Sequence, residues 1–70
     1  MKRFRIHYTR KNPIMGGKFI AHFDSNAINL KTAQIDAQRW ATVESNIRGV
    51  IITIDKIIQI AWQINGGIVI

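Results

Sequence analysis

Cysteine is absent from the sequence, and acidic residues number only four in 70. Without cysteine, the chain can form neither a disulfide framework nor a thiolate zinc site. A chain of this length is expected to form one domain, residues 1–70, which buries only about 60% of the surface that its unfolded state exposes. The core is therefore small, and a homodimer is one way in which such a core gains stability.

Long hydrophobic runs are also missing. No stretch approaches the roughly 20 apolar residues that cross a bilayer, and the N-terminal sequence MKRFRIHYTRK lacks the apolar segment of a signal peptide. Apolar residues nevertheless make up 47% of the chain, which is enough for a core and argues against disorder. The composition therefore predicts a soluble cytoplasmic protein with no membrane partner.

Groups suited to catalysis or metal binding are few. His7 and His22 are expected on neighbouring strands, where they could approach each other, but no third metal ligand is evident. The two serines have no adjacent base, and the four carboxylates form no acid–base pair by their spacing. The segment NPIMGGK lacks the spacing of a phosphate-binding loop. The sequence thus predicts no enzyme, no cofactor and no metal site.

Positive charge is concentrated at the start of the chain. The net charge is +6, and residues 1–18 contain six bases and no acid, whereas the bases and acids of residues 19–70 cancel. Such a basic region favours an anionic partner, nucleic acid or a nucleic-acid-binding complex first, because binding releases counterions from phosphates. The other interpretation is that the charge only keeps a small domain soluble.

Two strands are expected in the first third of the chain. Residues 3–10 alternate with period two, and so do residues 18–24. In the first strand the apolar face holds Phe4, Ile6 and Tyr8, and the opposite face holds arginines and His7. Period two is typical of a half-buried strand, so the basic side is expected to face water.

A hairpin loop is expected between these strands. Pro13 cannot donate to a strand ladder, and Gly16–Gly17 admits positive φ. The loop carries Met15 beside a second apolar residue at its tip, with Lys11 and Lys18 on either side. An apolar tip flanked by charge is either a segment that inserts into a partner or a mobile turn.

A single helix is expected after Thr32, whose hydroxyl would cap it. Its apolar stripe consists of Ala33, Ala37, Trp40 and Ala41. Trp40 would anchor the helix to the sheet, whereas Arg39, rotated by about 100°, would point to solvent. There Arg39 would contact a carboxylate or phosphate of a partner, or pair with Asp36 at i,i+3. The helix is expected to end at Asn46 or Gly49.

The last third of the chain is rich in β-branched residues. Residues 49–55 are expected to form a buried central strand, and residues 56–64 a further strand after a turn at Asp55–Lys56. Asn65–Gly66 predicts a type I′ turn into a final short strand, residues 67–70. The sequence therefore predicts an α+β fold in which one helix packs on one face of an antiparallel sheet of four to five strands, in the order β-β-α-β-β.

The uncovered face of this sheet is expected to carry the basic residues of the first strand. Its expected members are Arg3, Arg5, His7, His22, Thr53 and Gln59. Tyr8 and Trp62 could stack on nucleic-acid bases, but both share the apolar face of their strand and are interpreted as core residues.

Residues 37–55, AQRWATVESNIRGVIITID, resemble the helix-to-strand segment of small phage anti-CRISPR proteins that act on type I-F surveillance complexes. The positions that keep the register of that segment are Ala37, Arg39, Ala41, Glu44, Gly49 and Ile54. Residues 60–67, IAWQINGG, are similar to the final hairpin of that family, with Gly66 as its turn glycine. The resemblance extends over residues 30–70, and the β-β-α-β-β order agrees with it.

The resemblance implies a phage-encoded inhibitor in the cytoplasm of the host cell. In that family a helical Lys-Arg pair and other bases grip the subunits that display the guide RNA, which blocks pairing with target DNA. Arg39 carries over onto this chain, whereas Gln38 stands in place of the lysine. Val43 and Ile68 stand where the family has further bases, and in this chain the positive charge lies in the first strand and hairpin instead.

These observations predict a protein that binds a partner, with three alternatives for the partner. The first is a Cas protein complex of type I, bound through a basic surface. The second is DNA or RNA bound directly, and the third is a second copy in a homo-oligomeric phage structural or accessory protein. The candidate contact residues are Arg39, Gln38, Arg3, Arg5, Lys11, Lys18 and Met15.

Overall fold

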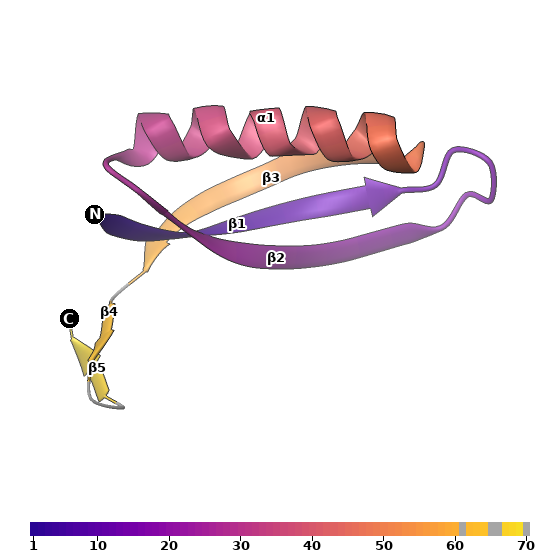
Figure 1. Cartoon of the computed structure of the whole chain (residues 1–70). Helices are drawn as coiled ribbons and strands as arrows, with labels where there is room; N and C mark the ends of the chain where they lie inside the picture. The colour runs from indigo at the N-terminus through magenta and orange to yellow at the C-terminus, as the bar shows by residue number, and fades with distance from the viewer. Residues whose placement is uncertain (61, 65–66, 70) are drawn as a thin grey trace.

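The computed structural model describes the backbone of residues 1–60, 62–64 and 67–69 and the side chains of residues 1–60. Its elements follow the predicted β-β-α-β-β order, with a short fifth strand (Figure 1). They are β1 (Lys2–Lys11), β2 (Lys18–Ala27), α1 (Leu30–Arg48), β3 (Ile51–Ile60), β4 (Trp62–Ile64) and β5 (Gly67–Val69). The α+β class, the antiparallel pairing and the single helix packed on the sheet agree with the prediction.

The sheet has three strands in the order β2-β1-β3, so the first strand of the chain is the central one. Both neighbours run antiparallel to β1. β4 and β5 pair only with each other among the described residues, as a separate two-stranded ladder. A single sheet of four to five strands is therefore not what the structure contains. The turn predicted at Asn65–Gly66 lies outside the described residues.

β3 corrects two further expectations. Residues 51–60 form one strand, and Asp55–Lys56 is not a turn within it. His7 pairs with Lys56 and Tyr8 pairs with Ile54, so Asp55 is an extra residue in a β-bulge. β3 is an edge strand with half or more of its residues exposed, and not a buried central strand.

The bulge changes which side chains of β3 face the helix. Ile54 and Ile57 both lie opposite inward-facing residues of β1, although period two alone would place them on opposite faces. Gln59 lies opposite the buried Phe4, so the expectation that Gln59 joins the basic face is wrong.

Helix α1 begins earlier than the sequence analysis predicts. Its N-cap is Asn29, whose Oδ1 accepts the backbone N–H of Thr32 at 2.8 Å, so Thr32 is not the cap. The last helical residue is Arg48, and the C-cap is Gly49, the second of the two predicted ends, which adopts the left-handed conformation with φ of 65°. Among the described residues no helix combines the length and apolarity needed to span a membrane.

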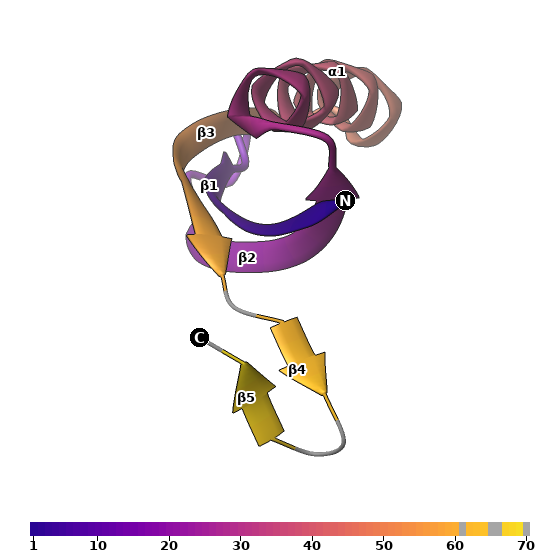
Figure 2. The ribbon, with the colours of Figure 1, turned by 90° about the vertical axis from the view of Figure 1, so that its left-hand side faces the viewer.

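The core lies between α1 and the concave face of the sheet (Figure 2). Three alanines one helical turn apart, Ala33, Ala37 and Ala41, are buried on the helix. Because their side chains are small, the helix can lie close to Phe4 and Ile6, which are each 1% exposed. Only these two large side chains are fully buried in the described part of the chain, so the core is small, as predicted.

An aromatic cluster closes the core between α1 and the hairpin strands. The ring centroid of Trp40 lies 4.9 Å from that of Tyr8 and 4.6 Å from that of Phe23. These separations are typical of favourable edge-to-face and tilted aromatic pairs. Trp40 therefore anchors the helix to the sheet, and Tyr8 is a core residue, as the sequence analysis predicts.

Candidate anion-binding surface

The sheet face that α1 leaves uncovered carries most of the candidate residues. Along β1, the buried Phe4 and Ile6 point toward the helix, so the odd-numbered residues point away from it. Residues directly opposite each other in an antiparallel sheet share a face. The register therefore adds β2 and β3 residues to this outer face. Its polar members are Arg3, Arg5, His7, Thr9, Lys11, Lys18, His22, Asp24, Asn26, Thr53 and Lys56. The carboxylate of Asp55, at the bulge, also reaches this face, where it accepts a hydrogen bond from Thr9 Oγ1 at 2.7 Å.

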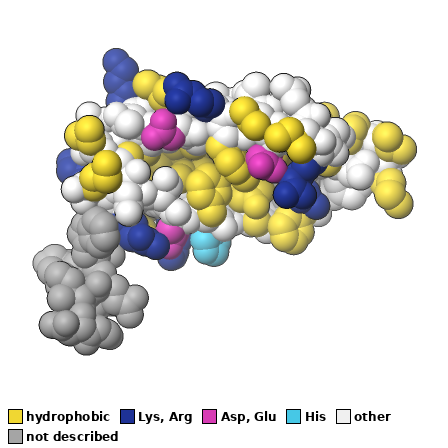
Figure 3. Space-filling model, viewed as in Figure 1, with side chains coloured by type: hydrophobic (Ala, Val, Ile, Leu, Met, Phe, Trp, Pro, Cys, Tyr) yellow, Lys and Arg dark blue, Asp and Glu magenta, His cyan; other side chains and the backbone are white. Residues whose placement is uncertain are grey.

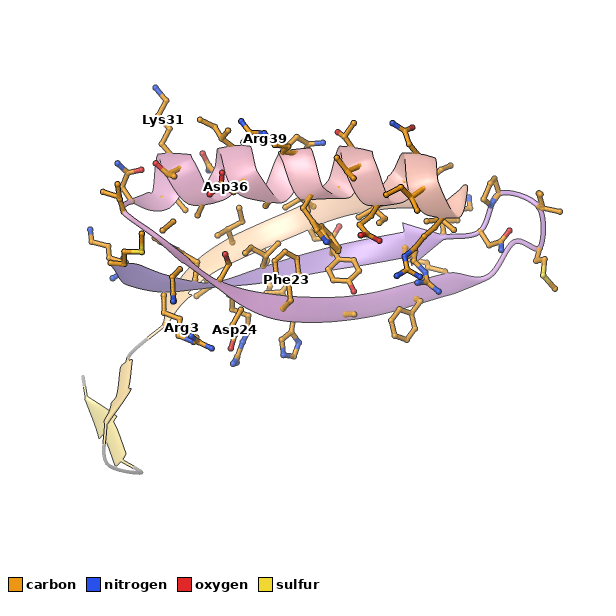
Figure 4. The ribbon with its side chains drawn as sticks, in the orientation of Figure 1. Arg3, Phe23, Asp24, Lys31, Asp36 and Arg39 are labelled. Atoms are coloured by element: carbon orange, nitrogen blue, oxygen red, sulfur yellow. The ribbon has the colours of Figure 1, made fainter. Side chains whose placement is uncertain are left out.

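Asp24 binds both arginines at one end of this face. Arg5 Nε and Nη2 donate to the two carboxylate oxygens of Asp24 at 2.9 and 3.1 Å. Arg3 Nη2 lies 3.7 Å from the same carboxylate, and Arg3 Nη1 donates to Asn26 Oδ1 at 3.4 Å. Figure 4 shows Arg3 and Asp24 on the side of the sheet away from the helix. Two of the six bases of residues 1–18 therefore share an internal counterion.

The Arg5–Asp24 pair fixes the charge of both groups. The hydrogen bonds from Arg5, followed by the positive charge of Arg5 and Arg3, hold the pKa of the Asp24 carboxyl below its ordinary value, against the opposing effect of burial. The same hydrogen bonds raise the pKa of Arg5 above its ordinary value. A partner that binds Arg5 would have to compete with a bidentate carboxylate.

The two histidines meet across the hairpin, as expected. The ring centroids of His7 and His22 are 5.4 Å apart. Burial, and then the positive charge of Lys56, lower the pKa of His7, with smaller contributions from His22 and Arg5 and an opposing one from Asp55. Within residues 1–60 no group of three His, Cys, Asp or Glu side chains could hold a metal ion.

At the opposite end of the sheet, the bases have no acidic partner among the ion pairs found in residues 1–60. Lys11 and Lys18 lie directly opposite each other where the two strands meet the loop, and Arg10 is next along β1. In the ion pairs found in residues 1–60, the basic partner is Arg3, Arg5 or Arg48. A shallow pocket of about 210 Å³ lies beside these bases. Its lining residues are Arg10, Asn12, Gly17, Lys18, Phe19 and Val50.

The loop between β1 and β2 projects beyond the C-terminal end of α1 (Figure 1). Ile14 and Met15 at its tip are 91% and 84% exposed. Asn12 Oδ1 accepts the backbone N–H groups of Ile14 and Met15 at 2.9 and 3.0 Å. Two further backbone bonds join Asn12 to Gly16 and Gly17, each at 2.9 Å. The loop thus has a shape defined by its own hydrogen bonds.

The remaining candidates, Gln38 and Arg39, lie on the exposed side of α1. Figure 4 shows Arg39 on the side of the helix away from the sheet. The i,i+3 ion pair between Asp36 and Arg39 is not among the ion pairs found in residues 1–60. The ion pair that does form on the helix is Arg48 Nε with Glu44 Oε2, at 2.6 Å.

The structure therefore divides the candidate residues into three groups. Arg3 and Arg5 lie at the start of β1, Lys11, Lys18 and Met15 lie at the hairpin end, and Gln38 and Arg39 lie on the other side of the molecule. Figure 3 shows Lys and Arg side chains dispersed over one face rather than gathered in a single patch. Sequence reasoning missed Asp24 as the counterion and Lys56 as a member of the outer face.

No protein-family model, curated protein or solved structure matches this chain. The resemblance of residues 37–55 to anti-CRISPR proteins thus stays a hypothesis.

Proposed function

We propose that the protein is an inhibitor that binds a nucleic-acid-bearing CRISPR–Cas surveillance complex of type I. It binds through its cationic groups and acts by occupancy, because it blocks access of the target nucleic acid to the complex. The observation that supports this proposal is that Lys11 and Lys18 at the hairpin end and Arg39 on α1 take part in none of the ion pairs found in residues 1–60. The resemblance of residues 37–55 is the reason that a Cas complex is proposed as the partner.

The hairpin end is the strongest part of this cationic surface. Like charges placed directly opposite each other on a sheet are destabilising, and Lys11 and Lys18 form such a pair. An anion placed between them would relieve this repulsion. Each phosphate contact would also release condensed counterions, so that binding should weaken as the salt concentration rises.

Arg3 and Arg5 are weaker candidates than the sequence analysis implies. The carboxylate of Asp24 already accepts hydrogen bonds from both Nε and Nη2 of Arg5. Arg39 keeps its role in the proposal because it is exposed on α1 and has none of the ion pairs found within residues 1–60.

Affinity capture of a purified, guide-loaded type I complex tests the proposal. The double variant Lys11→Glu/Lys18→Glu and the single variant Arg39→Glu should capture less complex than the natural sequence. Lys2→Glu/Lys31→Glu is the matched control, because it reverses two exposed charges at the other end of the molecule. Equal capture by all of these variants would show that the cationic groups do not form the contact.

Direct binding of nucleic acid is a second candidate function, favoured by the same unpaired lysines. It requires no protein partner and should fall steeply with salt. A gel shift with free DNA and RNA at two ionic strengths separates it from the first proposal. The absence of any shift at low salt would remove it.

Self-association is a third candidate, favoured by apolar side chains on the outer face. Ile20, Ile51 and Ile58 are 69%, 52% and 42% exposed, and the register places all three on this face. β2 and β3 also form the edges of the sheet, where unpaired strand groups can accept another strand. Light scattering that detects only a monomer at high concentration would exclude a homo-oligomer.

A further inference from the structure

We propose that the hairpin end, residues 10–19, is a binding element that recognises duplex DNA. It enters the major groove with Lys11 and Lys18 on the phosphates and with Ile14 and Met15 against the base edges. This inference takes only its class of ligand from the second proposed function. It adds the site, the duplex form of the nucleic acid and the part of the base that is contacted.

The first observation is the combination of exposure and fixed shape at the tip. Ile14 and Met15 are among the most exposed large apolar side chains in the described residues. Exposed apolar groups usually cost free energy in water. Hydrogen bonds from the backbone of Ile14 and Met15 to Asn12 Oδ1, together with the positive φ of Gly16, 73°, nevertheless define the shape of the loop. A preformed tip loses little conformational entropy when it binds.

The second observation is the arrangement of charge below the tip. Lys11 and Lys18 lie on opposite strands, one on each side of the loop. The guanidinium of Arg10 lies over the ring of Phe19, with 5.8 Å between Cζ and the ring centroid. Both residues lie on the sheet face opposite to that of the lysines. The hairpin end therefore presents positive charge on both faces and an apolar tip beyond it, and no acid lies on residues 10–19.

The shape of this segment fits the major groove. Paired strands lie about 4.8 Å apart, and the major groove, about 12 Å wide, admits a two-stranded ribbon. The lysines would then lie near the phosphates that border the groove. Figure 3 shows apolar side chains at the far end of the molecule, where Figure 1 places this loop, so nothing in the described structure blocks its approach.

Two other anionic ligands fit less well. Single strands are bound through aromatic side chains on which bases stack, whereas the tip residues Ile14 and Met15 are aliphatic. An anionic membrane would have to be held by these few apolar carbons, together with Pro13. Even one myristoyl chain, which has more carbons, anchors a protein only marginally.

The two apolar side chains at the tip can read one feature of a base pair. The Oδ1 atom of Asn12 is already occupied by two backbone N–H groups, and the side chains of Ile14 and Met15 offer no strong donor or acceptor. The apolar group exposed in the major groove is the C5-methyl of thymine. The hairpin end should therefore prefer duplexes rich in thymine over matched duplexes that contain uracil.

The test measures the affinity of the intact protein for a fluorescent duplex of about 20 base pairs with a thymine-rich sequence. Ile14→Ser/Met15→Ser should weaken binding about tenfold, because it removes the apolar contact. Lys11→Gln/Lys18→Gln should lower the slope of log K against log salt by about two, one for each phosphate contact. The control Ile28→Ser/Ile47→Ser removes two other isoleucines, which are 67% and 74% exposed, and should bind normally.

The outcomes separate this inference from the proposed functions. Replacement of thymine by uracil should weaken binding of the natural sequence a few-fold and leave binding of Ile14→Ser/Met15→Ser unchanged. Equal affinity of the tip variant and its control would overturn the inference, and so would preference for a single strand or for phosphatidylserine vesicles. Failure of the natural sequence to capture the complex, with duplex binding intact, would instead refute the first proposed function. Thermal melting of each variant shows that it is folded.

Discussion

Asp24 determines how much of the positive charge on the outer face is available to a partner. It accepts three contacts from Arg3 and Arg5, and its carboxyl stays ionised because those contacts lower its pKa. The local charge is therefore one less than the two arginines alone would give. Single side chains of this kind decide which of the basic residues can act in binding.

Removal of this counterion should strengthen binding to polyanions. We expect Asp24→Asn to elute from a heparin column at higher salt than the natural sequence, because Arg3 and Arg5 lose their shared carboxylate. The control Asp36→Asn makes the same change of charge on an exposed helical position that has no ion pair among those found in residues 1–60. An equal shift for both variants would show that only net charge matters.

Asp24 should also make stability depend on pH in acid. Because its folded-state pKa is lowered, its stabilising effect is complete above its unfolded pKa of about 3.9 and is lost as the pH falls through the folded value. The urea midpoint should thus fall on acidification below about pH 4. The fall should be smaller in Asp24→Asn, and an identical fall would contradict the role of the pair.

His7 should add a second pH dependence near neutrality. Its folded-state pKa lies below the ordinary 6.5, so the unfolded chain takes up the proton first as the pH falls, and the folded state loses stability below about pH 6.5. The urea midpoint of the natural sequence should therefore be lower at pH 5.5 than at pH 7.5. The difference between the two midpoints should be smaller in His7→Asn. An equal difference in both proteins would contradict this role of His7.

At the scale of elements, α1 is defined by its two ends and by one aromatic anchor. Asn29 caps the first turn, and Gly49 reverses the chain, so that Val50 N–H can bond to Ser45 O at 3.2 Å. Ser45 Oγ also accepts the N–H of Ile52 at 3.2 Å, which ties the helix end to β3. These contacts set where the helix lies over the sheet.

The C-terminal cap of α1 should require glycine at position 49. Gly49→Ala should cost about 1 kcal/mol, because its φ of 65° is unfavourable for a residue with a Cβ atom. Gly17→Ala is the control, since Gly17 lacks positive φ and a Cβ there would meet no atom within 4 Å. Urea unfolding measures both, and equal costs would contradict this account of the cap.

Trp40 should contribute more to stability than any other exposed or half-buried helix side chain. Trp40→Ala should cost about 2–3 kcal/mol, below the roughly 3–5 kcal/mol of a fully buried aromatic, because it loses the contacts with Tyr8 and Phe23 but was partly exposed. Val43→Ala, at a position 48% exposed, should change stability by less than about 0.5 kcal/mol. Similar losses for both would mean that the aromatic cluster does not hold the helix.

Elements set by local sequence could be predicted, and those set by distant pairing could not. The alternation in β1 and β2 and the glycine at the end of α1 are local signals, and the structure agrees with them. The bulge at Asp55 depends on pairing with His7 and Tyr8, far away in the chain, so period two in β3 alone was misleading. At the helix start, Asn29 and Thr32 both carry a capping oxygen, and the sequence did not discriminate between them.

The ion pair between Arg5 and Asp24 could have been predicted from the sequence. Along β1 and β2 the residue numbers of every cross-strand pair add up to 29, because the loop fixes the register. Once the hairpin was assumed, Arg5 could have been placed opposite Asp24. The separation of Arg39 from the hairpin end could not be predicted, because it depends on which side of the sheet α1 packs.

At the scale of the whole molecule, positive charge is presented in several directions and the core is small. The hairpin end projects past the helix (Figure 1), and Arg39 lies on the side of the helix away from the sheet (Figure 4). Arg3 and Arg5 both contact Asp24. A flat partner bound to the outer face of the sheet could not contact Arg39 at the same time. The hairpin end combines unpaired charge with an exposed apolar tip, so it is the group on which the proposed binding depends most.

The most direct measurement is displacement of fluorescent target DNA from a purified, guide-loaded type I surveillance complex, with free target DNA as the reference. The natural sequence should displace the DNA at low salt and less at high salt. Lys11→Glu/Lys18→Glu should need at least about tenfold more protein, since two phosphate or carboxylate contacts are lost, and Lys2→Glu/Lys31→Glu should act normally. Failure of the natural sequence to displace the DNA, or equal potency of the two double variants, would contradict the account.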